Sequence, residues 1–417
     1  MKFSEQEPRC YTRALLGKIV LVLRLAVTLT FAACTLGAGS PPQVEKPESA
    51  GMSSERLARI GTWLDGVVER GEAAGFVTIV ARRGKVVHHE ARGTRGLSVK
   101  EPMPIDGIFD MASMTKAITV TAALILLEEG RFTLEDPLGD YLPGFKDARV
   151  QVGAKAFVPA ESEITIRQLF THTSGIADPR GRGEVYEFPT LKEYIQDAAK
   201  LPLQAQPGST WLYGDSHDVL GYLVETVSGE PFGEFVRTRI LDPLQMDDTH
   251  FWPPGSKDGR RAVLGVRGKD DLDSTSRRPL KAAEAATFIG GQSGIYSTAA
   301  DYWRFCQMLL NGGELDGVRL LGPRTVGWIN EDHMQGAGGF DRPGHVFGLG
   351  FAVMTDPGEA GWYYSPGSYY WSGSQGTLFW IDPQEELTAV LMVQTTPSSH
   401  LKLREKFAAI VYGAIVD

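Results

Sequence analysis

Residues 111–116 read Met-Ala-Ser-Met-Thr-Lys, and the mainly apolar run 117–127 that follows contains neither glycine nor proline. A run of this length and composition is typical of a buried helix. Ser113 and Lys116 are three residues apart, so a helix would place them on one face. Burial disfavours the charged form of a lysine, and a neutral amine can activate a serine nucleophile without histidine. The stretch therefore predicts a buried helix that starts at a serine nucleophile and its base.

The spacing of Ser113 and Lys116 is not specific by itself. A serine three residues before a lysine is expected about once in a chain of this length. A second copy, Ser399 with Lys402, opens the last predicted helix, and helix capping is sufficient to explain it. The assignment of Ser113 thus depends on the rest of the chain.

Composition limits the classes of function. The 417 residues are 42% hydrophobic and 22% charged, which is ordinary for a globular protein with one elaborate domain or two. A net charge of −9 gives a nucleic-acid partner no electrostatic support.

The N-terminus differs from the rest of the chain. Basic residues precede or interrupt an apolar stretch over residues 19–33, and the sequence Ala-Ala-Cys ending at Cys34 resembles a lipoprotein cleavage site. We expect residues 1–44 to be a signal segment and linker, with export to the periplasm or a lipid anchor as a membrane tether. The alternative is a basic extension on a cytoplasmic protein. Removal of the segment would leave Cys306 as the single cysteine, which excludes a disulfide framework within the mature chain. Cys306 is most simply interpreted as a core thiol.

Periodicity predicts an α/β (α+β) fold. Strands are expected over residues 76–81, 85–91, 349–353, 378–381 and 387–393, and helices after Thr165, after Ser216, over 298–310 and over 401–416. Strands thus lie near both chain ends, and mainly helices lie between them. The simplest assembly is one antiparallel sheet built from both ends and flanked by helices, with an inserted helical domain. The expected boundaries are 45–133 with 286–417 for the sheet domain, and 134–285 for the insertion.

Further motifs follow residues 111–116 in order. They are residues 166–175 (Ile-Arg-Gln-Leu-Phe-Thr-His-Thr-Ser-Gly), Tyr213 before residues 218–221 (Asp-Val-Leu-Gly), residues 290–298, residues 347–351 and residues 371–380. In this order, over roughly residues 50–415, the chain resembles the serine β-lactamase and penicillin-binding-protein superfamily. Within it the chain is most similar to the class C-like branch with its β-lactamase-like (family VIII) carboxylesterases. The resemblance implies a β-lactamase/transpeptidase-like fold.

The resemblance also implies roles for individual residues. Ser113 would be the acylated nucleophile, Lys116 its base or proton relay, and Tyr213 would share the proton transfers. A tyrosine normally titrates far above neutral pH, so Tyr213 needs Lys116 nearby as a cation or hydrogen-bond donor. The backbone N–H groups of Ser113 and Ser374 would form the oxyanion hole.

Two departures from the family pattern affect the expected substrate. The Tyr-x-Asn element reads Tyr213-Gly214-Asp215, with a carboxylate in place of the amide. The Lys-Thr-Gly element is replaced by Trp371-Ser372-Gly373, which removes a cation that would bind a substrate carboxylate. We expect Asp215 and residues 371–373 to contact the substrate, and a tryptophan wall favours an uncharged acyl or alcohol group.

Other patterns receive simpler interpretations. The Gly-x-Ser-x-Gly motif of α/β-hydrolases is absent, and His88-His89 lack metal-ligand spacing, so we expect neither a metal nor a cofactor. His172 is interpreted as a structural histidine beside the site. The glycine-rich turn 290–294 is interpreted as close backbone packing rather than a phosphate loop.

The sequence therefore predicts a serine hydrolase that cleaves short- to medium-chain carboxylic esters through an acyl-enzyme. Its partner is a small-molecule ester, and the sequence does not define an oligomeric state. Alternatives are β-lactamase or D,D-peptidase activity, acyl transfer to an alcohol, and a non-catalytic binding protein of the same fold. Intact Ser113, Lys116 and Tyr213 argue against the last, since a binding protein has no need of all three.

Overall fold

The computed structural model describes residues 41–177, 188–266, 273–274 and 288–417. The expected signal segment, apart from residues 41–44, lies outside these ranges. Within them, every helix is too short or too polar to cross a membrane.

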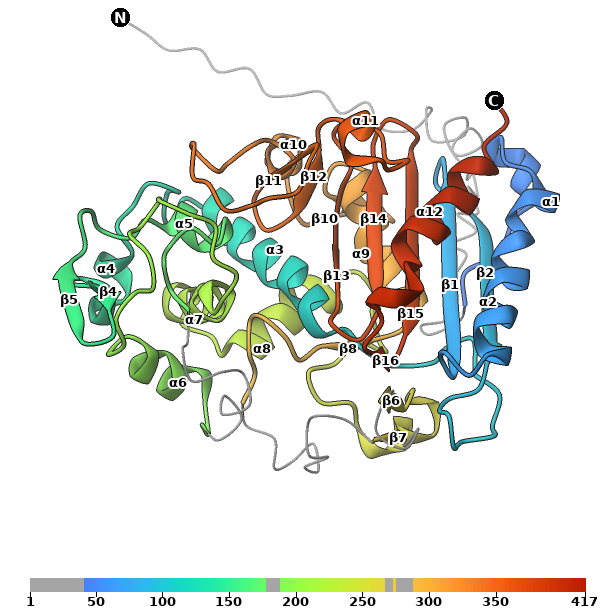
Figure 1. Ribbon diagram of the computed structural model, residues 1–417, viewed down its shortest axis with the longest axis horizontal. Helices are drawn as coiled ribbons and strands as arrows, with labels where there is room; N and C mark the ends of the chain where they lie inside the picture. The colour runs from blue at the N-terminus through green and yellow to red at the C-terminus, as the bar shows by residue number, and fades with distance from the viewer. Residues whose placement is uncertain (1–40, 178–187, 267–272, 275–287) are drawn as a thin grey trace, which may run out of the picture. The chain divides into compact units, whose positions relative to one another are not determined.

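A seven-stranded sheet forms the centre of the fold, in the order β11-β12-β13-β14-β15-β1-β2 (Figure 1). Every neighbouring pair is antiparallel. The strands are β1 (Gly75–Arg82), β2 (Lys85–Gly93), β11 (His345–Phe347), β12 (Ala352–Met354), β13 (Tyr369–Ser372), β14 (Leu378–Asp382) and β15 (Leu387–Val393). Because β1 pairs with β15, strands from the two ends of the chain form one sheet, as the periodicity predicts.

Helices cover both faces of this sheet. In Figure 1, α12 (Leu403–Gly413) and α2 (Arg59–Glu69) lie in front of it, and α9 (Ala299–Leu310) lies behind it. Every residue of β1 and β15 is consequently buried, and these strands read as continuous apolar runs rather than as alternating patterns.

The other helices lie mostly between β2 and β11 in the chain. They are α1 (Ser54–Leu57), α3 (Thr115–Glu128), α4 (Leu138–Tyr141), α5 (Ile166–Phe170), α6 (Leu191–Ala198), α7 (Ser216–Ser228), α8 (Phe232–Val236), α10 (Pro323–Ile329) and α11 (Pro357–Ala360). Helix α3 is apolar on all sides and is buried for nearly its whole length, as a helix without a polar face must be. The expected capping box at Thr165 and the left-handed Gly229 that ends α7 are both present.

Short strand pairs complete the fold. Three of them are β3 (Phe109–Asp110) with β8 (Tyr296–Ser297), β4 (Arg149–Gly153) with β5 (Ala156–Pro159), and β9 (Glu314–Leu315) with β10 (Val318–Arg319). A further small sheet joins β16 (Thr395–Thr396), β6 (Leu264–Val266) and β7 (Asp273–Ser274). The segment 134–285, expected to be mainly helical, thus also contains the β4–β5 hairpin.

The predicted strand over 349–353 was placed too early. Residues 348–350 form a turn, in which Gly350 has a φ of 81°, and β12 starts only at Ala352. A Cβ on Gly350 would lie 2.3 Å from the Val120 side chain, so the turn packs directly on α3. The described residues form one compact unit, and the predicted boundaries at 134 and 285 remain predictions.

Candidate active site

Ser113 lies on a 3₁₀ turn, Ala112–Met114, that leads directly into α3. Its predicted partner Lys116 lies in the first turn of the helix, and the two side chains are 6% and 1% exposed. The helix therefore begins two residues later than the sequence indicates. The two groups are nevertheless buried together at the helix start.

The turn that carries Ser113 is held in an unusual conformation. Ala112 has a φ of 45°, a left-handed conformation that costs an alanine about 1–2 kcal/mol. The Asp110 carboxylate accepts a hydrogen bond from the Ala112 N–H at 2.9 Å, and the Met111 N–H donates to the Ile295 carbonyl at 2.9 Å. These bonds, with the β3–β8 pair, fix the direction in which Ser113 projects.

Lys116 connects the nucleophile helix to two other segments. Its Nζ donates to the Gln292 carbonyl at 2.9 Å and lies 4.6 Å from the centre of the Tyr213 ring. The structure thus brings Lys116 and Tyr213 together, as the resemblance implies. Gln292 follows two glycines, and a Cβ on Gly291 would lie 2.1 Å from the His217 carbonyl, so this turn is indeed a close backbone approach.

Tyr213 lies in an environment that favours proton transfer. Burial alone would raise its pKa, but the charge of Lys116 and hydrogen bonding to Lys116, Ser113 and Trp371 together lower the pKa below its ordinary value. A phenol whose pKa is lowered by an adjacent cation can act as a base closer to neutral pH. The arrangement is therefore competent for nucleophile activation through Lys116 and Tyr213.

Two histidine rings lie behind Tyr213. The His172 ring centre is 4.8 Å from that of Tyr213 and 4.3 Å from that of His217. Burial, and then the charge of Lys116, hold the pKa of His217 well below its usual range. His172 is thus beside the site, where the sequence places it, as part of a packed layer of rings.

The end of β13 approaches the nucleophile turn closely. A Cβ on Gly373 would lie 2.7 Å from the Met111 carbonyl, a distance that only glycine permits without movement. Gln375 Nε2 donates to Asp110 Oδ2 at 3.4 Å, so one carboxylate contacts both segments. The exposed Ser374 lies in the turn after β13, next to Gln375. The use of the Ser113 and Ser374 N–H groups as oxyanion donors stays a prediction.

Asp215 is turned into the protein rather than toward open space. Its side chain is 4% exposed, Tyr194 Oη donates to Oδ2 at 2.8 Å, and Gln292 Nε2 donates to Oδ1 at 2.8 Å. These contacts make it a support for the Gln292 turn. Its predicted contact with substrate remains a prediction.

Aromatic side chains line the approach to Tyr213. Trp211 stacks on Tyr213 with ring centres 5.6 Å apart, and Trp371 lies 5.7 Å from it. Phe347 contacts both tryptophans at 5.6–5.7 Å. The predicted tryptophan wall is therefore part of a larger aromatic cluster.

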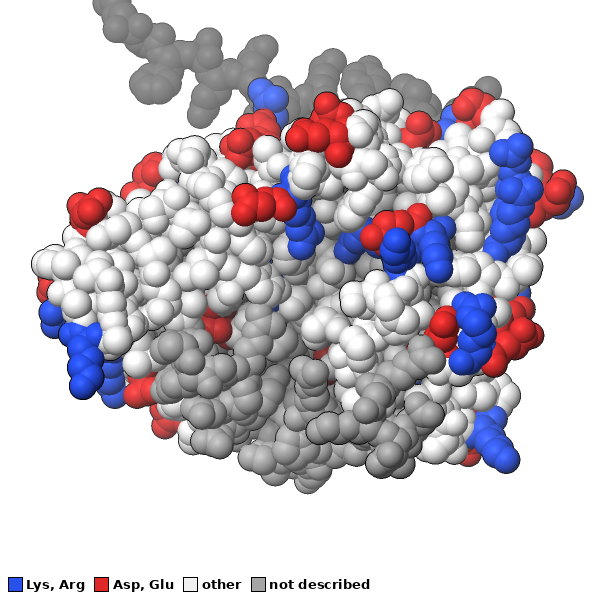
Figure 2. Space-filling model, viewed as in Figure 1, with Lys and Arg blue, Asp and Glu red and all other residues white. Residues whose placement is uncertain are grey.

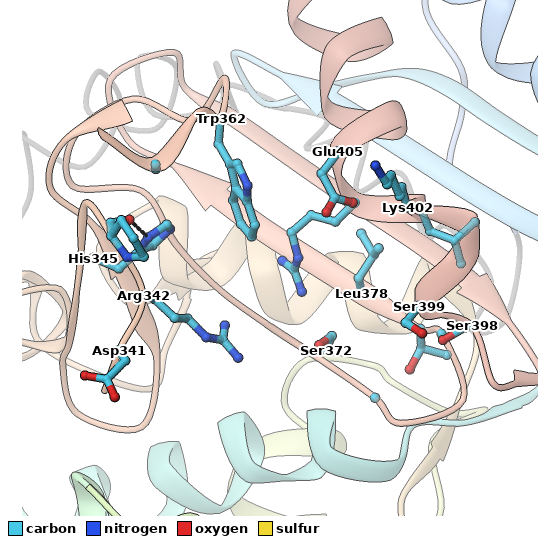
Figure 3. Close-up of a pocket in the computed structure, with 17 residues that line it drawn as sticks. Asp341, Arg342, His345, Trp362, Ser372, Leu378, Ser398, Ser399, Lys402 and Glu405 are labelled. Carbon is cyan, nitrogen blue, oxygen red and sulfur yellow. Dashed lines mark hydrogen bonds between the residues drawn. The ribbon is translucent and has the colours of Figure 1, made fainter. Parts of the chain in front are cut away.

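A pocket of about 530 Å³ lies beside this cluster, lined in part by Ser372 and Gly373 (Figure 3). Arg342 extends toward its centre, with its guanidinium carbon 5.4 Å from the centre of the Trp371 ring. Lys402, Arg404 and Glu405 contribute from the start of α12, and Figure 2 shows basic and acidic side chains next to each other over this helix. Among the described residues, Arg342 forms no ion pair.

The sequence assigned no role to three residues that support this site, Asp110, Asp218 and Gln292, although Asp218 and Gln292 lie within the motifs 218–221 and 290–298. Each acts through contacts with backbone distant in the chain, and a local pattern does not record such contacts. Gln292 had a partial signal, because it follows the glycines of the turn 290–294.

Comparisons with known proteins agree with this geometry. Residues 61–412 match the family described as beta-lactamase. A Mycobacterium tuberculosis protein, whose name states no activity, is 32% identical over 325 residues, which cover 72% of this chain and 80% of the relative. Esterase EstB of Burkholderia gladioli is 30% identical over 335 residues, covering 73% and 81%. The solved structure of EstCE1, titled a hydrolase with promiscuous acyltransferase activity, superposes with a TM-score of 0.72 at 24% identity and covers 86% of this chain and 99% of its own. The chain belongs to the beta-lactamase family, among relatives that include esterases.

Proposed function

We propose that the protein is a serine carboxylesterase that cleaves short- to medium-chain esters through an acyl-enzyme on Ser113. The observation that supports this most directly is the placement of the Lys116 amine 4.6 Å from the centre of the Tyr213 ring, with Ser113 hydrogen-bonded at the same phenol. These are the groups that a serine nucleophile requires when no histidine serves as its base.

The chemistry follows from these positions. The Ser113 hydroxyl oxygen attacks the ester carbonyl carbon while its proton passes to the Tyr213 phenolate, which the adjacent Lys116 ammonium stabilises. The tetrahedral intermediate then expels the alcohol oxygen, which takes this proton as the C–O bond breaks. Water repeats the sequence on the acyl-enzyme and releases the carboxylic acid. Backbone N–H groups aimed at the developing oxyanion supply the electrostatic stabilisation.

The aromatic cluster supports an ester as the substrate. The partly exposed Trp211, packed on the buried Trp371 and Phe347, offers an apolar surface against which an acyl or alcohol group can bury its carbon atoms. The esterase relative at 30% identity supports the same class of reaction.

The position of Arg342 favours a second candidate. The loss of the family's Lys-Thr-Gly lysine was expected to leave no cation here, yet the Arg342 guanidinium lies 5.4 Å from the Trp371 ring. A guanidinium without an ion-pair partner in the described chain can bind a carboxylate. β-Lactamase or D,D-peptidase activity on carboxylate-bearing substrates is therefore the second proposal. Acyl transfer to an alcohol would use the same acyl-enzyme.

A paired turnover assay tests the proposal. One set of reactions uses p-nitrophenyl esters of graded acyl length, and the other uses a chromogenic cephalosporin, each with the wild-type protein and with Ser113→Ala. We expect rapid ester cleavage, slow lactam cleavage, and loss of both in the variant.

Faster cleavage of the cephalosporin than of every ester would favour the second candidate. Activity that persists in Ser113→Ala would place the nucleophile elsewhere. No turnover, together with a wild-type Ser113 that a fluorophosphonate does not label, would indicate the non-catalytic binding protein.

A further inference from the structure

Gln292 forms three hydrogen bonds, each with the side chain of a lysine or an aspartate. Its carbonyl accepts from Lys116 Nζ at 2.9 Å, and its N–H donates to Asp218 Oδ1 at 2.9 Å. Its side-chain amide donates to Asp215 Oδ1 at 2.8 Å. The position of the carbonyl that receives the Lys116 amine thus depends on carboxylates at the start of α7.

Asp218 is the deepest of these carboxylates. Its side chain is 0% exposed, and its second oxygen, Oδ2, has no hydrogen-bond partner among the residues that the structure describes. A fully buried carboxylate with half of its acceptor capacity unused is costly for stability. Nothing in the acyl-enzyme chemistry described above gives this group a task.

We propose that Asp218 is a positioning residue for nucleophile activation: its carboxylate fixes the Gln292 backbone that receives Lys116 and supplies the negative charge that faces the Lys116 ammonium. The ammonium in turn lowers the pKa of Tyr213. This inference rests on the proposed acyl-enzyme function and adds a residue that touches neither substrate nor reacting atoms.

The groups that act on Asp218 come from several elements. Burial raises the pKa of Asp218 to about 7, the nearby Asp215 charge adds to this, and the Gln292 N–H and the Lys116 charge oppose it. The adjacent His217 ring is held neutral by burial and by Lys116.

Charged groups on the neighbouring helices are directed elsewhere. From α6, Tyr194 donates to Asp215 rather than to Asp218. From α5, Arg167 is bonded to Glu135 and His333. Burial and the Asp215 charge therefore raise the pKa of Asp218 against the Gln292 N–H and Lys116, and Asp218 gains its charge as the pH rises through about 7.

The substitution Asp218→Asn separates the charge from the hydrogen bond. An asparagine Oδ1 still accepts the Gln292 N–H, but the side chain stays neutral at every pH and so resembles the protonated acid. The readout is the rate at which a fluorophosphonate labels Ser113, measured from pH 6 to pH 8 alongside kcat/KM for an ester. We expect the variant to be labelled as fast as the wild type near pH 6 and roughly tenfold more slowly near pH 8. Positioned proton transfer typically accelerates a reaction by about 10²–10⁴-fold, and a positioning residue should account for only part of that acceleration.

Asp301→Asn is the matched control. Asp301 is also buried, on α9, and burial raises its pKa to about 6. Its hydrogen bonds come from Thr249 Oγ1 at 2.8 Å and the Asp248 N–H at 2.9 Å, away from Lys116. This variant also loses a buried carboxylate, so we expect its melting temperature to change. Because Asp301 does not contact the Lys116 segment, we expect its labelling rate to vary with pH as it does in the wild type.

A ratio of wild-type to Asp218→Asn labelling rates that stays constant with pH would overturn the inference, as would an equal effect in Asp301→Asn. If Asp218→Asn does not fold, the wild-type profile still tests the inference, because a labelling rate that stays flat across pH 7 would overturn it. A wild-type Ser113 that is never labelled contradicts the proposed function itself, whereas labelling without this pH response contradicts only the role of Asp218.

Discussion

At the scale of single residues, Tyr213 has the most demanding task in the proposed mechanism. It is buried, which disfavours a phenolate, and it depends on the Lys116 charge to offset that cost. The adjacent His217 ring cannot provide this charge, because burial keeps it neutral. Lys116 is therefore the cation on which the reactivity of both Ser113 and Tyr213 depends.

The substitution Tyr213→Phe tests the proton transfer to the leaving group. A p-nitrophenolate departs without a proton, whereas an alkoxide requires one, so the loss should depend on the ester. We expect acylation by an alkyl ester to slow by about 10²–10⁴-fold, and acylation by the p-nitrophenyl ester of the same acid to slow much less. Pre-steady-state acylation rates for the two esters provide the measurement, and equal losses would contradict a role for Tyr213 in leaving-group protonation.

The substitution Arg342→Gln tests whether the pocket beside β13 prefers charged substrates. We expect Arg342→Gln to weaken turnover of esters with a carboxylate on the alcohol by at most about fivefold, because the side chain is exposed and solvent would screen its ion pair with the substrate. Neutral esters of the same size should be unaffected. The comparison is made by kcat/KM, with Arg319→Gln as control, since Arg319 pairs with Glu314 on the β9–β10 hairpin. An unchanged preference would remove the support for carboxylate-bearing substrates.

At the scale of elements, the contact between β13 and the nucleophile turn determines the geometry of the site. Gly373 donates its N–H to the Thr377 carbonyl at 2.8 Å, closing the turn that carries Ser374. On the other side of the contact, Ala112 is in a left-handed conformation. The strained Ala112 and the crowded Gly373 therefore face each other directly beside Ser113.

Gly373→Ala should separate these two elements. The new Cβ would lie 2.7 Å from the Met111 carbonyl, which is backbone and cannot rotate away, so β13 or the turn must move. A displacement of a few tenths of an ångström at an oxyanion site should reduce kcat by about 10²-fold or more while leaving KM nearly unchanged. Gly376→Ala is unsuitable as a control because its φ is 100°, but Gly327→Ala on α10, where a Cβ meets nothing within 4 Å, is well matched. Full activity in Gly373→Ala would show that the close approach is not required.

Elements with a strong local pattern were predictable from the sequence, and those defined by distant contacts were not. The apolar run 117–127 indicates α3, and two strand-like runs on either side of the turn at Arg83 indicate the β1–β2 hairpin. By contrast, β11 and β12 contain three residues each, too few for any periodicity. The partners of Asp218 belong to a segment 74 residues away, so no local pattern could show which way its carboxylate points.

At the scale of the whole molecule, the central sheet joins the two ends of the chain. The N-terminal strand β1 is inserted between β2 and the C-terminal β15, and the β1–β15 register pairs Phe76 with Val393 and Arg82 with Leu387. Such a pairing closes a very long loop and depends on burial of the whole sheet for its stability. Buried titratable groups within β1 and β2 therefore report on the stability of the complete fold.

His88 on β2 is such a group, and its pKa makes stability depend on pH. Its ring is 5% exposed, Nε2 lies 2.8 Å from Thr78 Oγ1, and burial lowers its pKa from 6.5 to about 4. Between these values the unfolded chain binds more protons than the folded one, so the free energy of unfolding falls as the pH drops from 6.5 to about 4. The contribution is fully present above pH 6.5 and amounts to up to about 3 kcal/mol.

We expect His88→Gln to remove this part of the pH dependence, because glutamine can bond Thr78 but does not titrate. Denaturant unfolding of the wild type and the variant at a series of pH values between 4 and 7 provides the measurement. The variant should be the less stable protein near neutral pH, where a packed ring is lost, and the difference should shrink or reverse as the medium becomes acidic. Parallel stability curves for the two proteins would mean that His88 binds its proton equally well in the folded and unfolded states, and that its burial does not couple the β1–β2 sheet edge to acid unfolding.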